Sequence, residues 1–235
     1  MNEHLAGKTI AVLGGTGAQG RGLARRFAEA GLAVVLGSRD ADRARETAAG
    51  LMDALNPVDR GGHLTGPTLG SITGDSNPAA ATVGDIVIVA VPWEGHASLL
   101  REVRAELAGK VVVDCVNPLG FDEHGAYALE VPEGSAAEQA AGILAESTVV
   151  GAFHNISAVL LEDPALRSIG TDVLVLGDDR AATDLIQELA AVIPGVRGIY
   201  GGRLRDAHQV EAFTANLISV NRRYRAHAGV RVTYL

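Results

Sequence analysis

Cysteine and lysine are scarce in this sequence, and their scarcity excludes several kinds of chemistry. The 235 residues include one cysteine, Cys115, which rules out an internal disulfide and a cysteine-rich metal site. The two lysines, Lys8 and Lys110, each precede an apolar run. Neither belongs to a Walker phosphate-binding loop or follows a tyrosine by four residues, as in short-chain dehydrogenases. We therefore expect no metal site and no catalytic lysine.

Long apolar runs and an excess of positive charge are also missing. No apolar stretch approaches the ~20 residues that span a bilayer, and the N-terminal residues do not have the pattern of a secretion signal. The formal net charge of −8 argues against nucleic acid as the main partner, because phosphate binding requires a basic face. With 47% hydrophobic and 20% charged residues, the sequence is typical of a soluble globular protein. We expect a cytoplasmic protein with no membrane and no nucleic-acid partner.

The beginning of the chain has the pattern of a βαβ unit. Residues 9–13 form a continuous apolar run, which is typical of a parallel strand covered on both faces. A glycine-rich turn follows, and then a segment at 21–30 in which Leu23 and Phe27 share one helix face. Gly31 ends this helix, and residues 33–36 form a second strand. Residues 8–37 thus have roughly the size expected of such a unit.

The rest of the sequence continues this alternation. Strands are predicted near 68–72 and at 85–91, 110–116, 148–153 and 172–176. Helices are predicted at 40–54, 135–145, near Ser157 and at 181–192, and a loop rich in Gly and Pro at 57–67. Five apolar residues at three- and four-residue spacing predict one buried face of a long final helix: Val210, Phe213, Leu217, Val220 and Tyr224.

These elements predict an α/β fold with a Rossmann-type doubly wound parallel sheet and a small C-terminal α/β subdomain. The length suits one Rossmann domain of roughly 150 residues and a smaller partner. We place the boundary near residue 155. Residues 1–155 are expected to bind NADP, and residues 156–235 to form the smaller subdomain.

A glycine motif lies between the first strand and the first helix. Its six residues satisfy the dinucleotide-binding pattern G-x-G-x-x-G: Gly15, Thr16, Gly17, Ala18, Gln19 and Gly20. We assign the tight turn to Gly15, the close approach of the pyrophosphate to Gly17, and the contact of helix with strand to Gly20. The pyrophosphate is then expected at the helix N-terminus. Gly14, Gly17 and Gly20 also fit G-x-x-G-x-x-G, the pattern of extended short-chain reductases and of NADP-sensing regulators.

The end of the second strand predicts which dinucleotide binds. An Asp or Glu at this point would hold the ribose hydroxyls of NAD, but the sequence has Ser38 and Arg39. The forked donors of Arg39 can pair with the 2′-phosphate of NADP, and Arg43 in the next helical turn can reach the same group. NADP(H) is therefore the expected dinucleotide.

Four segments together resemble a known family, the NADPH-dependent reductases of coenzyme F420. They are Ala11-Val-Leu-Gly-Gly-Thr-Gly-Ala-Gln-Gly20, Gly37-Ser-Arg39, Val91-Pro-Trp-Glu94 and Gly151-Ala-Phe-His-Asn-Ile156. The resemblance covers nearly the whole chain, and the Val91–Glu94 and Gly151–Ile156 segments are more specific to this family than the glycine motif. It implies a reversible hydride transfer between NADP(H) and the 5-deazaflavin coenzyme F420, in a homodimer.

The resemblance also implies roles for individual residues. Thr16, Ser38, Arg39 and Arg43 would hold NADP, and Val91, Pro92 and Trp93 would line the route of its nicotinamide half. The deazaflavin would lie against His154, Ile156 and Ala158, with the smaller subdomain completing its site. Two positions depart from the family pattern: Gly95 is an insertion between Glu94 and His96, and Ser157 stands where relatives often have proline.

The expected chemistry agrees with the absence of an obvious catalytic dyad. Transfer between two heteroaromatic carriers creates no alkoxide, so no acid is needed and proximity supplies most of the catalysis. His154 is the candidate positioning residue, although a histidine buried for structural reasons fits as well. Two alternatives stay open: an NADP-dependent imine, pyrroline or keto-acid reductase, and a non-catalytic NADP(H) sensor. The partners of the reductase would be small-molecule redox carriers.

Overall fold

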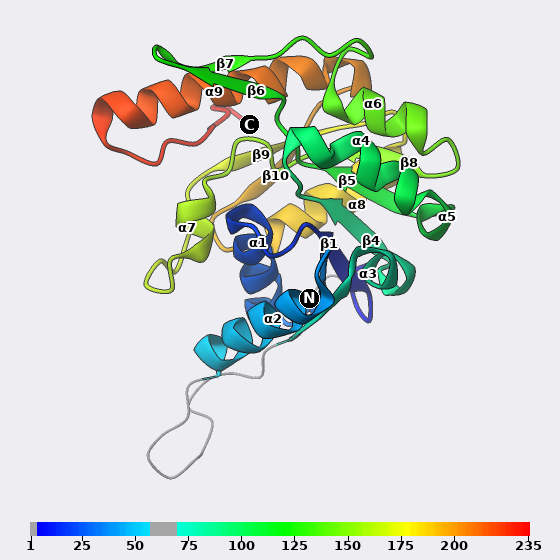
Figure 1. Cartoon of the computed structure of the whole chain (residues 1–235). Coiled ribbons are helices and arrows are strands. Elements are labelled where there is room, and N and C mark those ends of the chain that lie inside the picture. The colour runs from blue at the N-terminus through cyan, green and yellow to red at the C-terminus, as the bar shows by residue number, and fades with distance from the viewer. Residues whose placement is uncertain (1–3, 57–69) are drawn as a thin grey trace.

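A computed structural model describes residues 4–56 and 70–235 and contains one eight-stranded sheet covered by helices (Figure 1). The strand order is β10-β9-β8-β5-β4-β1-β2-β3. Six strands are parallel: β1 (Thr9–Leu13), β2 (Ala33–Ser38), β3 (Ser71–Ser76), β4 (Ile86–Val89), β5 (Val111–Asp114) and β8 (Thr148–Gly151). β9 (Asp172–Leu176) is antiparallel to β8, and β10 (Arg197–Gly202) pairs in parallel with β9.

The helices connect these strands and cover both faces of the sheet. In chain order they are α1 (Ala18–Glu29), α2 (Ala41–Leu55), α3 (Asn77–Val83), α4 (Trp93–Glu102), α5 (Arg104–Leu107), α6 (Ala136–Ile143), α7 (Ala158–Glu162), α8 (Arg180–Ala191), the 3-10 turn η1 (Leu204–Asp206) and α9 (Ala207–Tyr224). The predicted Rossmann-type α/β fold is confirmed. Within the described residues, no helix combines the length and apolar character needed to cross a membrane.

The first strand shows why both faces are covered. Ile10 and Val12 pack with α1, α2 and α8 on one face, whereas Ala11 and Leu13 pack with α3, α4 and α6 on the other. All four side chains are fully buried. At about 25 cal/mol per Å² of apolar surface, this two-sided burial favours the continuous apolar run found here over an alternating pattern.

Some predicted elements shift or change. β3 begins at Ser71, and the predicted loop at 57–67 lies outside the described residues. The elements that were not predicted are the antiparallel hairpin of β6 (Leu119–Asp122) and β7 (Gly125–Ala128), the edge strand β10, and the helices α3, α4 and α5. The hairpin packs along α9 (Figure 1). The boundary near residue 155 remains a prediction.

The buried face predicted for the final helix is wrong within this chain. Of the five apolar residues, Leu217 is buried, but Phe213, Val220 and Tyr224 are 43%, 38% and 74% exposed. α9 instead buries Ala207, Ala215, Leu217 and the acidic Glu211. The apolar spacing therefore marks a stripe that the chain itself leaves uncovered.

Candidate functional site at the carboxyl edge of the sheet

The candidate residues follow β1, β2, β4 and β8, so one edge of the parallel sheet holds them all. After β1 the chain continues to β2 on one side, and β4 lies on the other. This is the topological switch point at which open α/β sheets bind ligands.

The tight turn after β1 depends on Gly14 rather than on Gly15. Gly14 has φ +73°, in the left-handed region, and a β-carbon there would lie 2.6 Å from Val91 Cγ1. Asn77 at the start of α3 accepts a hydrogen bond from the Gly14 amide at 3.2 Å. The turn assigned to Gly15 is therefore wrong by one residue, because Gly15 has no positive φ.

The motif glycines serve different packing needs. A β-carbon at Gly15 would lie 2.7 Å from the Val12 carbonyl oxygen, and one at Gly20 would lie 2.6 Å from the Gly15 α-carbon. At Gly17 a β-carbon would meet only the Gly14 carbonyl oxygen, at an ordinary 3.5 Å. Gly15 and Gly20 are thus required by the protein itself. The exposed Gly17 is not, which leaves ligand approach as the reason for a glycine there.

The N-terminus of α1 is prepared for an anion. Gly17 is its N-cap residue, no side chain caps it, and its first turn contains no acidic residue. The first amides of a helix have no partner within the helix and carry partial positive charge. Gln19 turns its side-chain amide away, donating to the Phe153 carbonyl at 3.2 Å, and so links this turn to the segment after β8.

The residues that would select NADP lie at the end of β2. Ser38 is buried, and its hydroxyl accepts the Asp40 amide at 3.1 Å. Arg39 and Arg43 are exposed, and neither guanidinium has a carboxylate within ion-pair distance in the described part of the chain. Nearby Arg45 differs, because it pairs with Asp42 at 2.7 Å and Asp75 at 3.3 Å. Two unpaired guanidinium groups thus stand where a 2′-phosphate would be recognised.

The end of β4 contributes the Val91-Pro-Trp segment. Val91 and Trp93 are partly buried, whereas Pro92 is exposed and is the N-cap residue of α4. Trp93 begins this helix and stacks on His96, with ring centroids 5.5 Å apart and planes at 30°. The segment therefore offers an apolar surface beside the glycine turn.

The segment after β8 is held by its backbone. The His154 carbonyl accepts hydrogen bonds from Asn117 Nδ2 at 3.0 Å and from Thr214 Oγ1 at 3.1 Å. The preceding residue, Phe153, has φ +63° and packs edge-on against Phe27. Such an enforced backbone outside the usual regions is typical of functional segments.

The His154 ring lies inside the protein. It is 4% exposed, and neither ring nitrogen has a hydrogen-bond partner among the described residues. Burial lowers the pKa of this imidazole to about 4, although the Asp114 carboxylate acts in the opposite direction. The ring is therefore neutral near pH 7. Ile156 is buried beside it, and Ala158, at the start of α7, is partly exposed.

Arginines on α1 fix α7, which carries Ala158. Arg26 is 4% exposed and donates to the Leu160, Asp163 and Leu166 carbonyls at 2.9–3.0 Å. Arg21 pairs with Glu162 at 2.6 Å. The helix expected at the NADP pyrophosphate is thus joined directly to the segment expected at the deazaflavin.

Sequence reasoning missed several of these supporting residues. Asn77, Asn117, Thr214 and Arg26 hold the backbone of the site through bonds to residues far away in the chain. The position of Asn117, directly after the β5 strand and beside Pro118, was a usable signal, because polar residues at carboxyl ends of parallel strands meet at one edge. Nothing in the local sequence marks the other three.

A buried carboxylate lies on the opposite side of the C-terminal helix from the exposed stripe. Glu211 is 1% exposed and accepts the Ala136 and Ala137 amides at 2.9 and 3.1 Å, which caps the first turn of α6. Burial raises the pKa of Glu211 to about 7, and the two amides only partly offset this. This contact joins α9 to α6.

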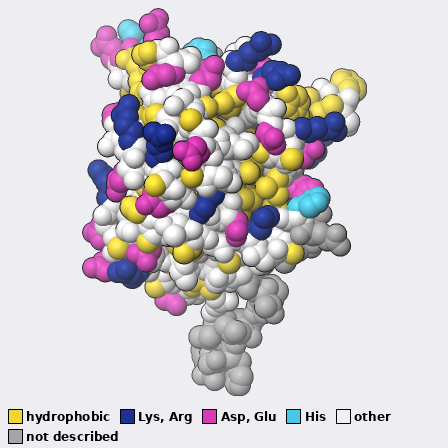
Figure 2. Space-filling model, turned by 90° about the vertical axis from the view of Figure 1, so that its right-hand side faces the viewer, with side chains coloured by type: hydrophobic (Ala, Val, Ile, Leu, Met, Phe, Trp, Pro, Cys, Tyr) yellow, Lys and Arg dark blue, Asp and Glu magenta, His cyan; other side chains and the backbone are white. Residues whose placement is uncertain are grey.

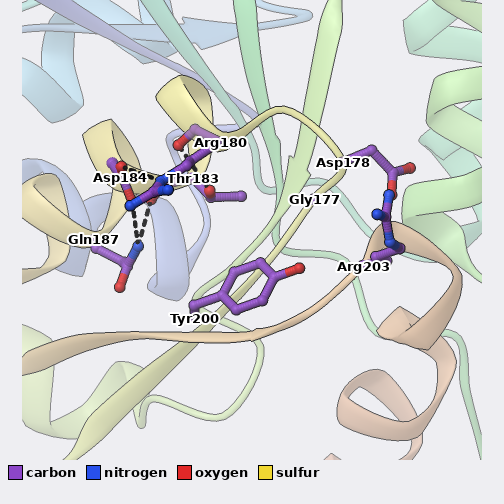
Figure 3. A pocket seen from close by; sticks show the side chains of 8 residues that line it. All are labelled: Gly177, Asp178, Arg180, Thr183, Asp184, Gln187, Tyr200 and Arg203. Atoms are coloured by element: carbon purple, nitrogen blue, oxygen red, sulfur yellow. Dashed lines mark hydrogen bonds and ion pairs between the residues drawn. The ribbon is translucent and has the colours of Figure 1, made fainter.

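A separate cavity of about 450 Å³ lies between α8 and β10 (Figure 3). None of the residues that line this cavity is a candidate site residue. The lining residues are Gly177, Asp178, Arg180, Thr183, Asp184, Gln187, Tyr200 and Arg203. Its two arginines face carboxylates, Arg203 with Asp178 at 3.4 Å and Arg180 with Asp184 at 3.6 Å. The cavity therefore offers no surplus charge to a ligand. Figure 2 likewise shows basic and acidic side chains interspersed over one face of the molecule.

Comparison with known proteins identifies relatives over almost the whole chain. A family profile described as "NADP oxidoreductase coenzyme F420-dependent" matches residues 9–118. The F420-dependent NADP reductase of Methanothermobacter thermautotrophicus is 39% identical over 231 residues, covering 96% of this chain and 95% of the relative. The enzyme of the same name from Methanocaldococcus jannaschii is 38% identical over 229 residues, covering 96% and 98%.

A solved structure has the same fold. It is a protein of Arthrobacter sp. FB24, provisionally named an F420-dependent NADP reductase, with a TM-score of 0.77 and 24% sequence identity. The match covers 97% of this chain and 100% of that one. At 24% identity this structure shows a shared fold, whereas the family is shown by the relatives that are 38–39% identical.

Proposed function

The chain belongs to the family of F420-dependent NADP reductases, and we propose on that premise that it transfers a hydride between NADP(H) and coenzyme F420 at the carboxyl edge of its sheet. The observation that supports this site is the open space around Gly17. This residue is the exposed N-cap of α1, and the packing of the protein does not itself require a glycine there. The imine-reductase and sensor alternatives have no comparable support from close relatives.

The residues at this edge fit NADP(H). The uncapped N-terminus of α1 would receive the pyrophosphate, because its amides are unpaired and no acidic side chain lies in its first turn. Arg39 and Arg43 would hold the 2′-phosphate, with Ser38 and Thr16 close to the same ribose and phosphate groups. Val91, Pro92 and Trp93 would then guide the nicotinamide toward the end of β8.

The segment from His154 to Ala158 would hold the deazaflavin. The two carriers supply the chemistry, a hydride passing between the nicotinamide C4 and the deazaflavin C5 while the deazaflavin exchanges a proton at N1. The protein has only to align the two rings and exclude water, since no alkoxide forms. A neutral, buried His154 suits this role, because near pH 7 its ring adds no charge to the site and does not serve as an acid.

The experiment that tests this function is a single-turnover reaction. The protein is mixed with excess NADPH and one equivalent of coenzyme F420, and the deazaflavin absorbance is followed against a sample lacking NADPH. The proposal expects complete loss of that absorbance with matching oxidation of NADPH. A protein that binds NADPH but leaves the deazaflavin unchanged would instead be a sensor, and one that reduces only imines would belong to the other alternative.

A second part of the proposal is a homodimer that covers the exposed stripe of α9. The β6–β7 hairpin packs along α9 (Figure 1), and Phe121 and Tyr127 of the hairpin are 69% and 46% exposed, as Phe213 and Tyr224 of the helix are also exposed. Clustered exposed aromatic residues are typical of protein interfaces, and a periodic stripe on a helix suits pairing with an identical helix across a twofold axis. A cytoplasmic location remains a prediction from the sequence.

Sedimentation at micromolar concentration tests the dimer. Phe213→Glu should shift the wild-type dimer to monomer, because a charge would be buried at the interface. Tyr200→Glu is the matched control, since Tyr200 is a 53% exposed aromatic residue on β10, away from the stripe. A monomeric wild-type protein would contradict the proposed homodimer but would not contradict the proposed hydride transfer.

A further inference from the structure

His96 is a completely enclosed ionisable side chain beside the candidate nicotinamide site. It lies on α4 and has no exposed surface. Its Nε2 lies 2.6 Å from Asp114 Oδ2, at the end of β5, and its Nδ1 lies 2.9 Å from Gln139 Oε1 on α6. Asp114 is equally buried and also accepts the Val116 amide at 3.0 Å.

The hydrogen bonds define the charge of this ring. The orientation of the Gln139 amide is fixed because its nitrogen donates to Glu133 at 3.2 Å, which leaves its oxygen facing His96. Both partners of the imidazole are therefore acceptors, and a neutral imidazole has only one N–H. With Asp114 as a carboxylate, both ring nitrogens must donate to satisfy these contacts, and the ring is then a positively charged imidazolium.

The position of His96 along the helix connects this charge to Trp93. Gly95 places His96 three residues after Trp93, the spacing at which helical side chains share a face. The two rings are stacked, with centroids 5.5 Å apart. A cation within about 6 Å of an indole face is attracted to the negative face of the ring.

We propose that His96 is a positioning residue, an imidazolium clamped by Asp114 and Gln139 that fixes the Trp93 ring as a wall of the nicotinamide site. This inference rests on the proposed function, in which Trp93 borders the nicotinamide. His96 does not touch the reacting atoms. It acts through Trp93, and its loss should loosen the nicotinamide half of NADP(H) without affecting recognition of the 2′-phosphate.

The surroundings of His96 agree with a retained charge. Burial lowers the pKa of the imidazole, but the charge and hydrogen bond of Asp114 outweigh it, so the pKa lies above its ordinary 6.5. The other ionisable groups nearby are Glu211 on α9, Glu133 before α6, which acts through Gln139, and His154 after β8. The charge of Glu211 also raises the pKa of the His96 imidazole, and His154 is itself neutral.

The test uses Trp93 as an internal reporter, because it is the single tryptophan of the chain. A protonated histidine stacked on an indole quenches its emission, so selective excitation of tryptophan reports the charge of His96 in the protein without cofactor. The proposal expects quenched emission at low pH and a recovery on raising the pH that is centred above the ordinary histidine pKa of 6.5, because the pKa of His96 is raised. A wild-type recovery centred at or below the ordinary histidine pKa would overturn it.

Two substitutions of the partly exposed Gln139 give a matched pair, in case changes at buried His96 impair folding. Gln139→Glu keeps an acceptor for His96, and Gln139→Leu removes it. The proposal expects Gln139→Leu to move the recovery of emission to lower pH and to raise the NADPH dissociation constant about fivefold. Gln139→Glu places a carboxylate beside the ring, so it should keep the recovery at the wild-type pH or higher and the dissociation constant within about twofold of wild type. Equal behaviour of the two variants would overturn it.

His96→Gln provides the direct comparison. Its emission should be brighter and independent of pH, and its KM for NADPH should rise several-fold with a smaller change in kcat. The affinity for 2′-phospho-ADP-ribose, which lacks the nicotinamide, should equal that of wild type. An equal loss of affinity for both ligands would show a general structural defect and contradict the positioning role. The fluorescence readouts need no coenzyme F420, so failure of the proposed hydride transfer would appear separately.

Discussion

The α-carbon of Gly15 lies 2.6 Å from the place that a β-carbon would occupy at Gly20. Strand β1 and helix α1 can approach this closely only because both positions are glycine. Gly20→Ala should therefore lower the stability of the protein without ligand by about 1–3 kcal/mol, through overpacking against backbone. Thermal melting of the apoprotein measures this loss of stability. An unchanged melting temperature would show that the turn accommodates the added methyl group, contrary to the prediction.

Gly17→Ala is the counterpart within the same motif. Its new methyl group would meet only one backbone oxygen at 3.5 Å, so the apoprotein should melt as wild type does. The methyl group would stand where the pyrophosphate approaches, and the NADPH dissociation constant should rise at least about tenfold. Titration calorimetry on both glycine variants separates the two roles. Unchanged affinity in Gly17→Ala would mean that this loop is only a turn.

Arg39 should determine the preference for NADPH over NADH. Loss of a charge-assisted contact costs about 1.5–3 kcal/mol, so Arg39→Ala should weaken NADPH binding about 10- to 100-fold and leave NADH binding nearly unchanged. Arg45→Ala is the control, because Arg45 is already paired with Asp42 and Asp75. Wild-type protein with equal affinity for both dinucleotides would refute the assignment.

Replacing Arg26 should lower the free energy of unfolding far more than replacing the neighbouring Arg25. Arg26→Met leaves three partly buried carbonyls of the α7 segment without their donor, which should cost about 2–4 kcal/mol. Arg25→Met removes a bond to Glu29 alone and should cost about 1 kcal/mol or less. Chemical denaturation of the two variants gives the comparison. Similar losses would mean that the α1–α7 junction does not depend on the Arg26 contacts.

Glu211 should make stability depend on pH in a defined window. Its pKa is about 7 in the folded protein and near the ordinary 4.5 when unfolded. Between these values the unfolded state releases the proton first, so the free energy of unfolding should fall as pH rises from about 4.5 to about 7. Glu211→Gln cannot titrate, and the difference between wild type and variant should show this fall. A difference that is flat or rises with pH would contradict the raised pKa.

The sequence predicts the central strands of the sheet well, because strands that are buried on both faces appear as continuous apolar runs. The apolar runs that contain β1, β4 and β5 are typical of parallel strands covered on both faces, and the glycine motif identifies the turn between β1 and α1. β10 was not predicted, because Arg197–Gly202 contains three glycines and is only partly buried. Its place at the sheet edge depends on pairing with β9, which local sequence does not encode.

The C-terminal helix shows a different limit. Periodicity locates an apolar stripe from Val210 to Tyr224, but it does not say whether the same chain covers that stripe. The structure buries Glu211 instead, because its carboxylate finds two helix amides. Likewise, the sequence offers Arg39 and His154 as site residues, whereas the bonds of Asn117 and Thr214 to the His154 carbonyl exist only after folding.

The most direct test of the central claim tracks the hydride itself. NADPH carrying deuterium at both C4 positions is mixed with the protein and one equivalent of coenzyme F420, and the reduced deazaflavin is analysed by mass spectrometry. Direct transfer between the two rings at the carboxyl edge predicts one deuterium per reduced deazaflavin, and protein without coenzyme F420 should leave the NADPH unoxidised. Reduced deazaflavin without deuterium, or no reduction despite tight NADPH binding, would contradict the account.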